Sequence, residues 1–195
     1  MKKVDTRLEN NPIRIQTPLN KEVCLSLRAG DMVLLSGEVY TARDAAHRRM
    51  YDSLKKDLVL PIDLSTATLF YAAPSPAPPG RVIGSIGPTT SYRMDAFTPV
   101  FIEHGLKGMI GKGGRSPEVV KAIRRYKAVY FGAIGGIAAL TARCVKKVEL
   151  VAYEDLGPEA IRKLTVTDLP LVVINDSQGN DLYQSEQSKW RILSK

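Results

Sequence analysis

The sequence predicts a single mixed α/β domain, and three observations lead to this fold class. The chain has 195 residues, which is the size of one ordinary domain. Apolar residues make up 44% and charged residues 25% of the composition, the balance of a globular protein with a buried core. Strand-like segments dominate the start of the chain and then alternate with helical ones, an order that indicates helices packed on a mixed sheet.

The strands are predicted from alternating polarity or from short apolar runs bounded by turn residues. The first segment alternates apolar and polar residues and is ended by Pro18. A Gly30-Asp31 turn precedes the second, which has the pattern of a buried strand. Strands are expected over residues 13–17, 32–40, 68–71, 82–86, 109–110, 128–131, 148–152, 171–174 and 182–184.

The helices are predicted from apolar spacing and from capping residues. Thr41 is expected to cap the second helix, with Asp44 three residues on in an approximate capping box. Ser116 is expected to cap the helix that begins at Pro117. Pro99 lies inside another predicted helix and indicates a kink or a later start there. Helices are expected over residues 21–28, 42–56, 93–104, 137–144 and 158–164, and from residue 117 onward.

Residues 72–80 contain four prolines, which forbid a helix and favour an extended loop. Such a segment is compatible with a linker between domains. A loop within one domain is the preferred interpretation, because strand-like segments lie on both sides of it. We therefore expect residues 1–195 to form one domain, with residues 185–195 as a polar tail that frays.

The two cysteines, Cys24 and Cys144, are far apart in sequence and form no CxxC pair. A zinc site or an iron–sulfur cluster needs three or four ligands, so we expect no metal site in this chain and two cysteines in the core. No apolar run approaches the roughly 20 residues that span a bilayer. Residues 1–5 are charged and lead into polar sequence rather than the apolar core of a signal peptide, which predicts a cytoplasmic location.

The formal net charge of +8 leaves two interpretations open. A basic stripe would bind nucleic acid by releasing counterions from phosphates, whereas a cationic cleft would attract small anions. The basic residues occur as scattered pairs without the aromatic pattern of an RNA-binding sheet, so we do not expect a nucleic-acid partner.

Three junctions between a loop and a helix have residues suited to binding anions. In the first, Arg43 lies in the first turn of a helix, where a cation opposes the helix dipole at a cost of about 0.3–1 kcal/mol. Such a placement indicates a binding role or a local pair with Asp44. His47 is one turn further along the same face. The alternative is an ordinary surface arginine beside a half-buried histidine.

The second junction is a hydroxyl-rich loop over residues 84–95 that includes Thr89 and Thr90 and leads into Arg93. Free backbone N–H groups at a helix start bind carboxylates, and an arginine can grip one with two hydrogen bonds. The third is residues 108–115, in which Lys112 stands among glycines. Its spacing differs from that of a P-loop, which excludes that mode of nucleotide binding. Together the junctions suit a small dianion with two carboxylates, although plain capping loops explain each one separately.

At these residues the sequence resembles the β subunit, or C-terminal domain, of class I fumarases and L-tartrate dehydratases. The resemblance covers roughly residues 12–184, with its motifs in order and well spaced. The matching segments are Gly30-Asp31 with Leu35-Ser36-Gly37, Thr41-Ala42-Arg43-Asp44-Ala45-Ala46-His47, Gly87-Pro88-Thr89-Thr90-Ser91-Tyr92-Arg93-Met94-Asp95 and Gly111-Lys112-Gly113.

This resemblance implies a swivelling β/β/α domain that packs against a larger α subunit. The α subunit of the family carries three cysteine ligands and a [4Fe–4S] cluster, whose open iron acts as a Lewis acid on the substrate. The expected assembly is thus a heteromer in which this chain holds no cofactor of its own and is inactive alone. Self-association of the isolated chain is left open.

The resemblance also implies roles for individual residues. Arg43 and Arg93 would clamp the substrate carboxylates, and Lys112 would add a further charge. Thr89 would take part in proton transfer, with Thr90 as the alternative hydroxyl, and His47 would orient a neighbour. A threonine hydroxyl needs an activating neighbour for such chemistry.

The expected reaction is the reversible hydration of fumarate to L-malate, a step of the tricarboxylic acid cycle. Dehydration of L-tartrate is the alternative within the same class, because both substrates are four-carbon dicarboxylates. A domain that binds nucleic acid or small anions without catalysis is the alternative from another class. Nucleic-acid binding would show a steep salt dependence.

Overall fold

The computed structural model describes residues 11–134 and 136–190. The strands are β1 (Ile13–Gln16), β2 (Met32–Thr41), β3 (Thr68–Phe70), β4 (Gly108–Gly111), β5 (Val129–Ala133), β6 (Val145–Ala152) and β7 (Ile161–Asn175). The α-helices are α1 (Lys21–Ser26), α2 (Asp44–Leu54), α3 (Thr98–Glu103), α4 (Pro117–Tyr126), α5 (Ala138–Cys144) and α6 (Leu182–Trp190). Two 3₁₀ segments are η2 (Ser91–Met94) and η3 (Glu154–Glu159). In this part of the chain, none of the helices has the length and apolar character needed to cross a membrane.

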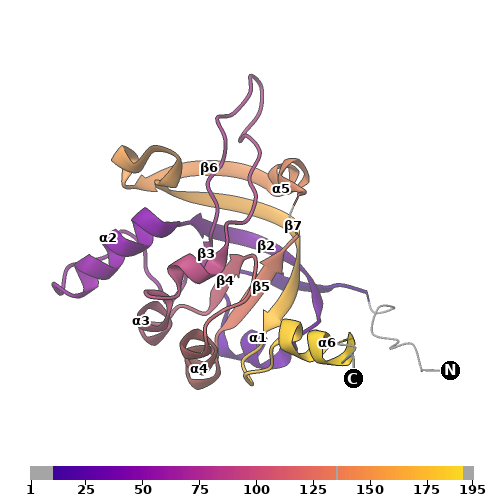
Figure 1. Ribbon diagram of the computed structural model, residues 1–195. Helices are drawn as coiled ribbons and strands as arrows, with labels where there is room; N and C mark the ends of the chain where they lie inside the picture. Colours follow the sequence, from indigo (N-terminus) through magenta and orange to yellow (C-terminus); the bar gives the residue numbers. More distant parts are fainter. Residues whose placement is uncertain (1–10, 135, 191–195) are drawn as a thin grey trace.

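Five of the strands close into a ring, in the order β2–β3–β4–β5–β7 and back to β2 (Figure 1). The strands β2, β3, β4 and β5 run parallel to one another. The long strand β7 runs antiparallel to both β2 and β5 and so completes the ring. Strand β1 extends the sheet beside the first half of β2, and β6 extends it beside the first half of β7. The chain is therefore a single mixed α/β domain built on a closed mixed sheet.

A bulge between Leu35 and Gly37 bends β2 where it pairs with β7. Gly37 has a φ of 108°, a left-handed conformation that favours glycine. A Cβ at this position would also lie 2.3 Å from Oγ1 of Thr17. The fold therefore requires the glycine of the Leu35-Ser36-Gly37 segment, because a side chain at position 37 would clash with the loop after β1.

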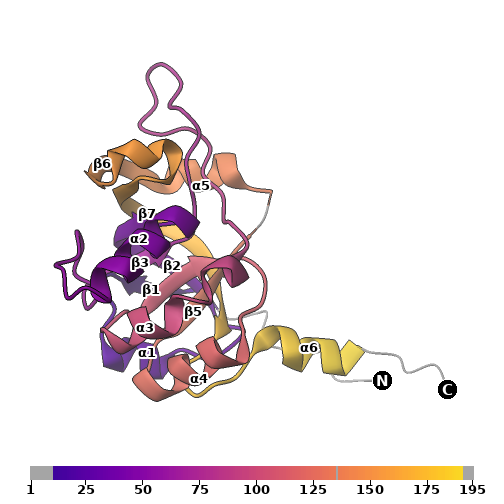
Figure 2. The same ribbon diagram turned by 60° about the vertical axis from the view of Figure 1, so that its left-hand side comes forward.

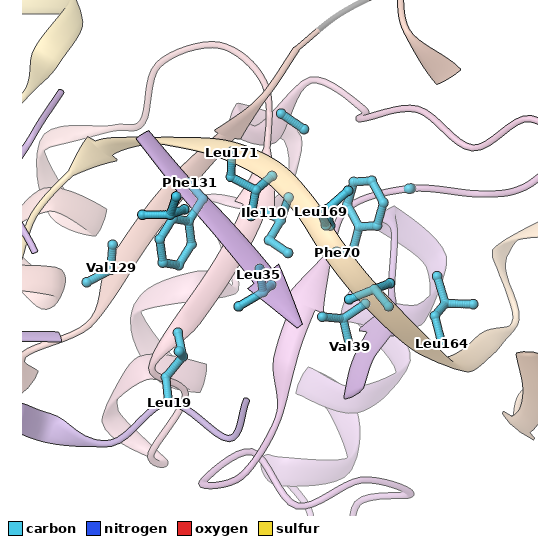
Figure 3. Packing of buried hydrophobic residues seen from close by; sticks show 14 of the residues in the cluster. Leu19, Leu35, Val39, Phe70, Ile110, Val129, Phe131, Leu164, Leu169 and Leu171 are labelled. Atoms are coloured by element: carbon cyan, nitrogen blue, oxygen red, sulfur yellow. The ribbon is translucent and has the colours of Figure 1, made fainter. Parts of the chain in front are cut away.

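The apolar residues of the strands alternate between two cores, as the two faces of a pleated strand require. Phe70, Ile110 and Phe131 point into the closed ring, where they pack with leucines and valines from β2 and β7 (Figure 3). Their neighbours Met109 and Tyr130 point outward and pack under α2, α3 and α4. Helices on the outside of the ring therefore cover the strands whose ends form the candidate site.

The proline-rich segment is an extended loop, as predicted, and rises far above the sheet in both ribbon views (Figures 1 and 2). Its residues from Ser75 to Val82 are exposed. The base is closed by a hydrogen bond from the Ser75 N–H to the Ser85 carbonyl, at 2.9 Å. Gly84 fits against this base, because its Cβ would lie 2.3 Å from the Ser75 carbonyl oxygen. We call residues 73–84 the proline arm.

Three predicted elements are wrong in type. Residues 158–164 do not form a helix, because β7 begins at Ile161 and pairs with β2 and β6. Residues 182–184 are not a strand but the first turn of α6, which points away from the sheet (Figure 2). Residues 82–86 are not a strand but run from the returning side of the proline arm into the segment that follows it. The predicted tail from residue 185 is helical as far as Trp190, and residues 191–195 lie outside the described part.

The start of α2 also differs from the prediction. Thr41 does not cap this helix but is the last residue of β2, and its hydroxyl accepts a hydrogen bond from the Arg162 N–H at 3.0 Å. Arg43 is the residue before the helix, and its side chain makes no capping bond. The helix predicted over residues 93–104 splits into η2 and the later α3, with Pro99 in the first turn of α3. Ser116 caps α4 as predicted.

Candidate functional site

The predicted site residues gather at the carboxyl ends of three neighbouring parallel strands. Strand β2 ends at Thr41, just before Arg43, and β4 ends at Gly111, just before Lys112. Strand β3, between them, leads through Tyr71 into the proline arm. Carboxyl ends of parallel strands are where α/β sheets bind ligands, because loops and helix N-termini converge there. The closed sheet thus brings all three predicted junctions to one edge.

Two arginines of the site meet at one carboxylate. Arg93 Nε lies 3.4 Å from Oδ1 of Asp44, and Arg43 Nη2 lies 3.8 Å from Oδ2 of the same residue. The Arg93 side chain is 40% exposed, whereas that of Arg43 is 25% exposed and its Nε is buried without a hydrogen-bond partner among the described residues. The pairing of Arg43 with Asp44 was one of the two outcomes predicted, and Arg93 shares that carboxylate.

Glu159 is a site residue that sequence reasoning missed. Its Oε1 lies 3.2 Å from Arg43 Nη2, and its Oε2 accepts a hydrogen bond from the Ala45 N–H at 3.2 Å. Glu159 therefore supplies the cap that α2 lacks and holds Arg43 at the same time. It comes from η3, 114 residues further along the chain, so no local signal could have revealed this contact.

His47 lies beneath Arg43 and is fully buried rather than half-buried. Its Nδ1 is 3.0 Å from the Arg43 carbonyl oxygen, and a carbonyl only accepts, so Nδ1 carries the proton. The ring of His47 lies against the rings of Tyr71 and Phe101, with centroids 5.1 and 5.2 Å away. Burial lowers the pKa of His47 to about 4. His47 is thus a neutral residue that contacts the backbone of Arg43 and does not reach the surface.

The hydroxyl loop is joined to the Lys112 loop by backbone hydrogen bonds. The Lys112 N–H donates to the Thr89 carbonyl at 3.3 Å, and Thr90 pairs with Lys112 in an isolated parallel bridge. The Thr89 N–H donates to the Tyr71 carbonyl at 2.6 Å. Thr89 and Thr90 are half-buried and Lys112 is exposed. Within the described residues, the Lys112 ammonium group makes no ion pair, which leaves it free for a ligand.

A buried ion pair fixes the base of the site. The Arg115 side chain is fully buried, and its Nε donates to Oδ1 of Asp95 at 2.7 Å. Oδ2 of Asp95 accepts from the Ser116 N–H at 2.6 Å. The Arg115 guanidinium also lies over the rings of Tyr71 and Tyr130. Both oxygens of Asp95 are thus occupied, so Asp95 is not available to activate a threonine hydroxyl.

The residues present do not fit an iron–sulfur cluster. Residues 11–134 and 136–190 contain no group of three or more His, Cys, Asp and Glu side chains that could hold a metal ion. Cys24 is fully buried, and burial raises the pKa of its thiol to about 11, which disfavours the thiolate that a metal needs. Cys144 lies partly exposed on α5 with its thiol directed at backbone carbonyls. The described residues therefore supply no ligand set for a cluster.

Two grooves, of about 510 and 360 Å³, lie beside α2 and at the base of the proline arm, and no predicted site residue lines either of them. What the site offers is two guanidinium groups, one ammonium group and a pair of threonine hydroxyls. These groups can hold a small molecule with two carboxylates but provide no strong base.

Comparisons with known proteins agree with this chemistry. The sequence profile of a family described as the C-terminus of fumarase matches residues 1–186. A Methanocaldococcus jannaschii protein provisionally named L(+)-tartrate dehydratase subunit beta is 40% identical over 177 residues, which cover 88% of this chain and 91% of that protein.

Two longer relatives are fumarate hydratases. Mitochondrial fumarate hydratase 1 of Leishmania major is 41% identical over 152 residues, or 77% of this chain and 28% of that protein. The anaerobic class I fumarate hydratase of Escherichia coli is 38% identical over 157 residues, or 80% of this chain and 29% of that protein. The chain thus spans less than a third of each of these two fumarate hydratases and nearly all of the tartrate dehydratase subunit.

Proposed function

The chain belongs to the fumarase C-terminus family, and from this premise we propose that it is the β subunit of a hydro-lyase that hydrates fumarate reversibly to L-malate. A separate α subunit would bring the [4Fe–4S] cluster and complete the site. We propose that residues 1–195 act as one domain, which swivels as a β/β/α unit against that subunit. A cytoplasmic location is part of the same proposal.

The observation that carries the proposal is the pair of arginines that meet at Asp44. Arg43 and Arg93 flank the carboxylate of Asp44, and the exposed Lys112 follows the end of β4, on the same edge of the sheet. A carboxylate that bridges two guanidinium groups is the arrangement that a substrate carboxylate would adopt. Asp44 would give up these contacts when a dicarboxylate binds, and Glu159 would keep Arg43 in place.

In the proposed mechanism this chain binds and orients the substrate. Arg43 and Arg93 would fix one carboxylate and stabilise the negative charge that develops there when a proton leaves C3. Lys112 would hold the second carboxylate. Fixing both ends removes rotational freedom before the reaction and so lowers its entropic barrier.

Thr89 is the proposed hydroxyl for proton transfer, with Thr90 as the alternative. Its backbone is anchored to Tyr71 and Lys112, so the loop presents the hydroxyl in a fixed place. Asp44 is engaged with arginines and Asp95 with Arg115, so the activating group is expected to come from the α subunit.

L-Tartrate dehydratase is the second candidate function. The relative with that name is 40% identical to this chain and is matched over 91% of its own length, which supports this candidate. Both substrates are four-carbon dicarboxylates, and the arginine pair would clamp either of them.

The test is an anaerobic assay of fumarate hydration, followed by the loss of fumarate absorbance, and of L-tartrate dehydration. Each assay uses this chain alone, the α subunit alone with its cluster reconstituted, and the two together. Activity only in the mixture, with a loss of at least about a hundredfold in Arg93→Ala, is expected. Arg125→Ala, an exposed arginine on α4, is the matched control and should retain activity.

The outcomes separate the alternatives. Turnover of L-tartrate without turnover of fumarate would identify L-tartrate as the substrate, and the proposed binding of its carboxylates by Arg43 and Arg93 would stand. If a stable, cluster-loaded complex turns over neither dicarboxylate, the proposed function is wrong. Full activity of Arg93→Ala would show that Arg93 does not bind the substrate carboxylate.

A further inference from the structure

The Lys112–Gly113 backbone is held at both ends by two buried hydroxyl groups. The Lys112 N–H donates to Ser91 Oγ at 3.1 Å, and Tyr130 Oη donates to the Gly113 carbonyl at 2.9 Å. Ser91 Oγ and Tyr130 Oη are themselves 2.9 Å apart. These three contacts close a ring across the loop that presents Lys112.

The direction of each hydrogen bond follows from the groups involved. The Gly113 carbonyl can only accept, so the single phenolic proton of Tyr130 points at it. The Tyr130 oxygen must then accept from the Ser91 hydroxyl. Ser91 Oγ is left to accept from the Lys112 N–H, which it shares with the Thr89 carbonyl. The hydrogen bonds therefore run in one direction, from Lys112 through Ser91 and Tyr130 to Gly113.

The surroundings exclude water from these hydrogen bonds and hold the two hydroxyl groups in place. Ser91 and Tyr130 are both fully buried, and burial raises the pKa of the Tyr130 phenol above its usual range, so the phenol remains a donor. Arg115 lies over the Tyr130 ring, with its guanidinium carbon 4.8 Å from the centroid. Gly111 leaves the space that Ser91 needs, because a Cβ there would lie 1.9 Å from Ser91 Oγ.

A second hydrogen bond joins Ser91 to the carbonyl group of Lys112. The Ser91 N–H donates to the Lys112 carbonyl at 2.9 Å, so Ser91 binds both the N–H and the C=O of Lys112. Ser91 also follows Thr89 and Thr90 directly. The spacing between the hydroxyl loop and the Lys112 loop is thus set by one buried serine, which Tyr130 holds in place.

We propose that Ser91 and Tyr130 are positioning residues that fix the origin of the Lys112 side chain relative to Thr89, so that the ammonium group meets a substrate carboxylate. This inference rests on the proposed function. Neither residue would touch the substrate, because both are buried beneath the loops. Their effect would pass through the backbone of Lys112.

The ring itself is tested by amide hydrogen exchange of the full chain, without any substrate. The Lys112 amide is expected to exchange about two- to tenfold faster than in the wild type in Ser91→Ala, which leaves it only the longer bond to the Thr89 carbonyl, and in Tyr130→Phe, which releases the Ser91 hydroxyl. Tyr126→Phe is the matched control, because it removes a phenol that donates to Glu103 at 2.7 Å outside the site. Unchanged exchange in both ring variants would overturn the proposal.

The functional part is tested by a double-mutant cycle in the complex with the α subunit. Tyr130→Phe is expected to raise KM about five- to a hundredfold with little change in kcat, because a carboxylate contact is lost in ground and transition states alike. In a Lys112→Ala background, Tyr130→Phe should add almost nothing. Tyr126→Phe should leave both constants unchanged.

The results distinguish this inference from the proposed function. Additive effects of Tyr130→Phe and Lys112→Ala would show a purely structural contribution and would refute the positioning role. If the wild-type complex is inactive on both dicarboxylates, the proposed function is refuted, and so is the positioning role that rests on it. An active complex with unaltered KM in Tyr130→Phe would refute the inference alone.

Discussion

The buried His47 makes the stability of this domain depend on pH in a way that can be calculated. Its ring is fully buried against aromatic side chains, and its Nδ1–H is used by the Arg43 carbonyl. Burial lowers the pKa of His47 from 6.5 to about 4 in the folded chain. The perturbation is a decrease in pH from 8 to 5, applied to the wild type and to His47→Gln.

The sign follows from which state binds the proton. Between pH 6.5 and about 4, an unfolded histidine is protonated while the buried His47 remains neutral. Protons therefore favour the unfolded state, and stability is lost as pH falls through this window. At pH 5 the unfolded ring binds nearly one proton and the folded ring about a tenth of one. The resulting loss of unfolding free energy between pH 8 and pH 5 is about 2 kcal/mol.

The assay is urea unfolding of the full chain across this range, with the free energy of unfolding extrapolated to water. The difference between wild type and His47→Gln removes the contribution of carboxylates, which titrate in both. His104→Gln is the matched control, because His104 contacts the Val100 carbonyl at 2.8 Å but is exposed. Parallel pH curves for the wild type and His47→Gln would refute the reasoning.

Two further predictions concern the packing beneath the site. Gly111→Ala should lower the free energy of unfolding by about 1–3 kcal/mol, because its Cβ would collide with Ser91 Oγ. Gly114→Ala has open space and should change stability little in the same urea titration. Arg115→Met should cost about 3–5 kcal/mol by thermal or urea unfolding, because it leaves a buried carboxylate uncompensated. Arg49→Met breaks an exposed ion pair, and an equal loss there would contradict this account.

Elements with a strong local pattern could be predicted from the sequence, and those decided by distant pairing could not. The alternating β1 and the Ser116 cap of α4 are local, and both were predicted. Residues 158–164 have a helical spacing, but Arg162 pairs with Thr41 in β2, 121 residues away. Tertiary pairing overrode the local preference there. The same pairing uses the Thr41 hydroxyl that was expected to cap α2.

The misassigned start of α6 had a signal in the sequence that was overlooked. Asp181 accepts a hydrogen bond from the Gln184 N–H at 3.2 Å, which is the contact of a helix N-cap. A short apolar segment after a turn fits a strand and a helix equally well by periodicity alone. The capping aspartate would have decided between them.

The sequence indicated the residues of the candidate site and a pair of Arg43 with Asp44, but not the contact of Arg93 with the same carboxylate. The motifs indicated Arg43, Arg93 and Lys112 one by one, because each stands beside a glycine or a helix start. That Arg43 and Arg93 share Asp44 follows from the packing of η2 against α2, which brings together two loops that are distant in sequence. The capping contact of Glu159 depends on the end of η3 and has no sequence signature.

The proline arm suits the attachment of a probe, because hydrogen bonds hold its base whereas its tip is exposed. The bridge between Ala72 and Pro88 and the bond from Ser75 to Ser85 close the arm well before its exposed tip. Changes at the tip should therefore leave the site loop undisturbed. Cys24 is buried, and burial raises the pKa of Cys144, so a thiol introduced by Ala77→Cys would react first with a maleimide dye. The arm thus offers one addressable position for a fluorophore.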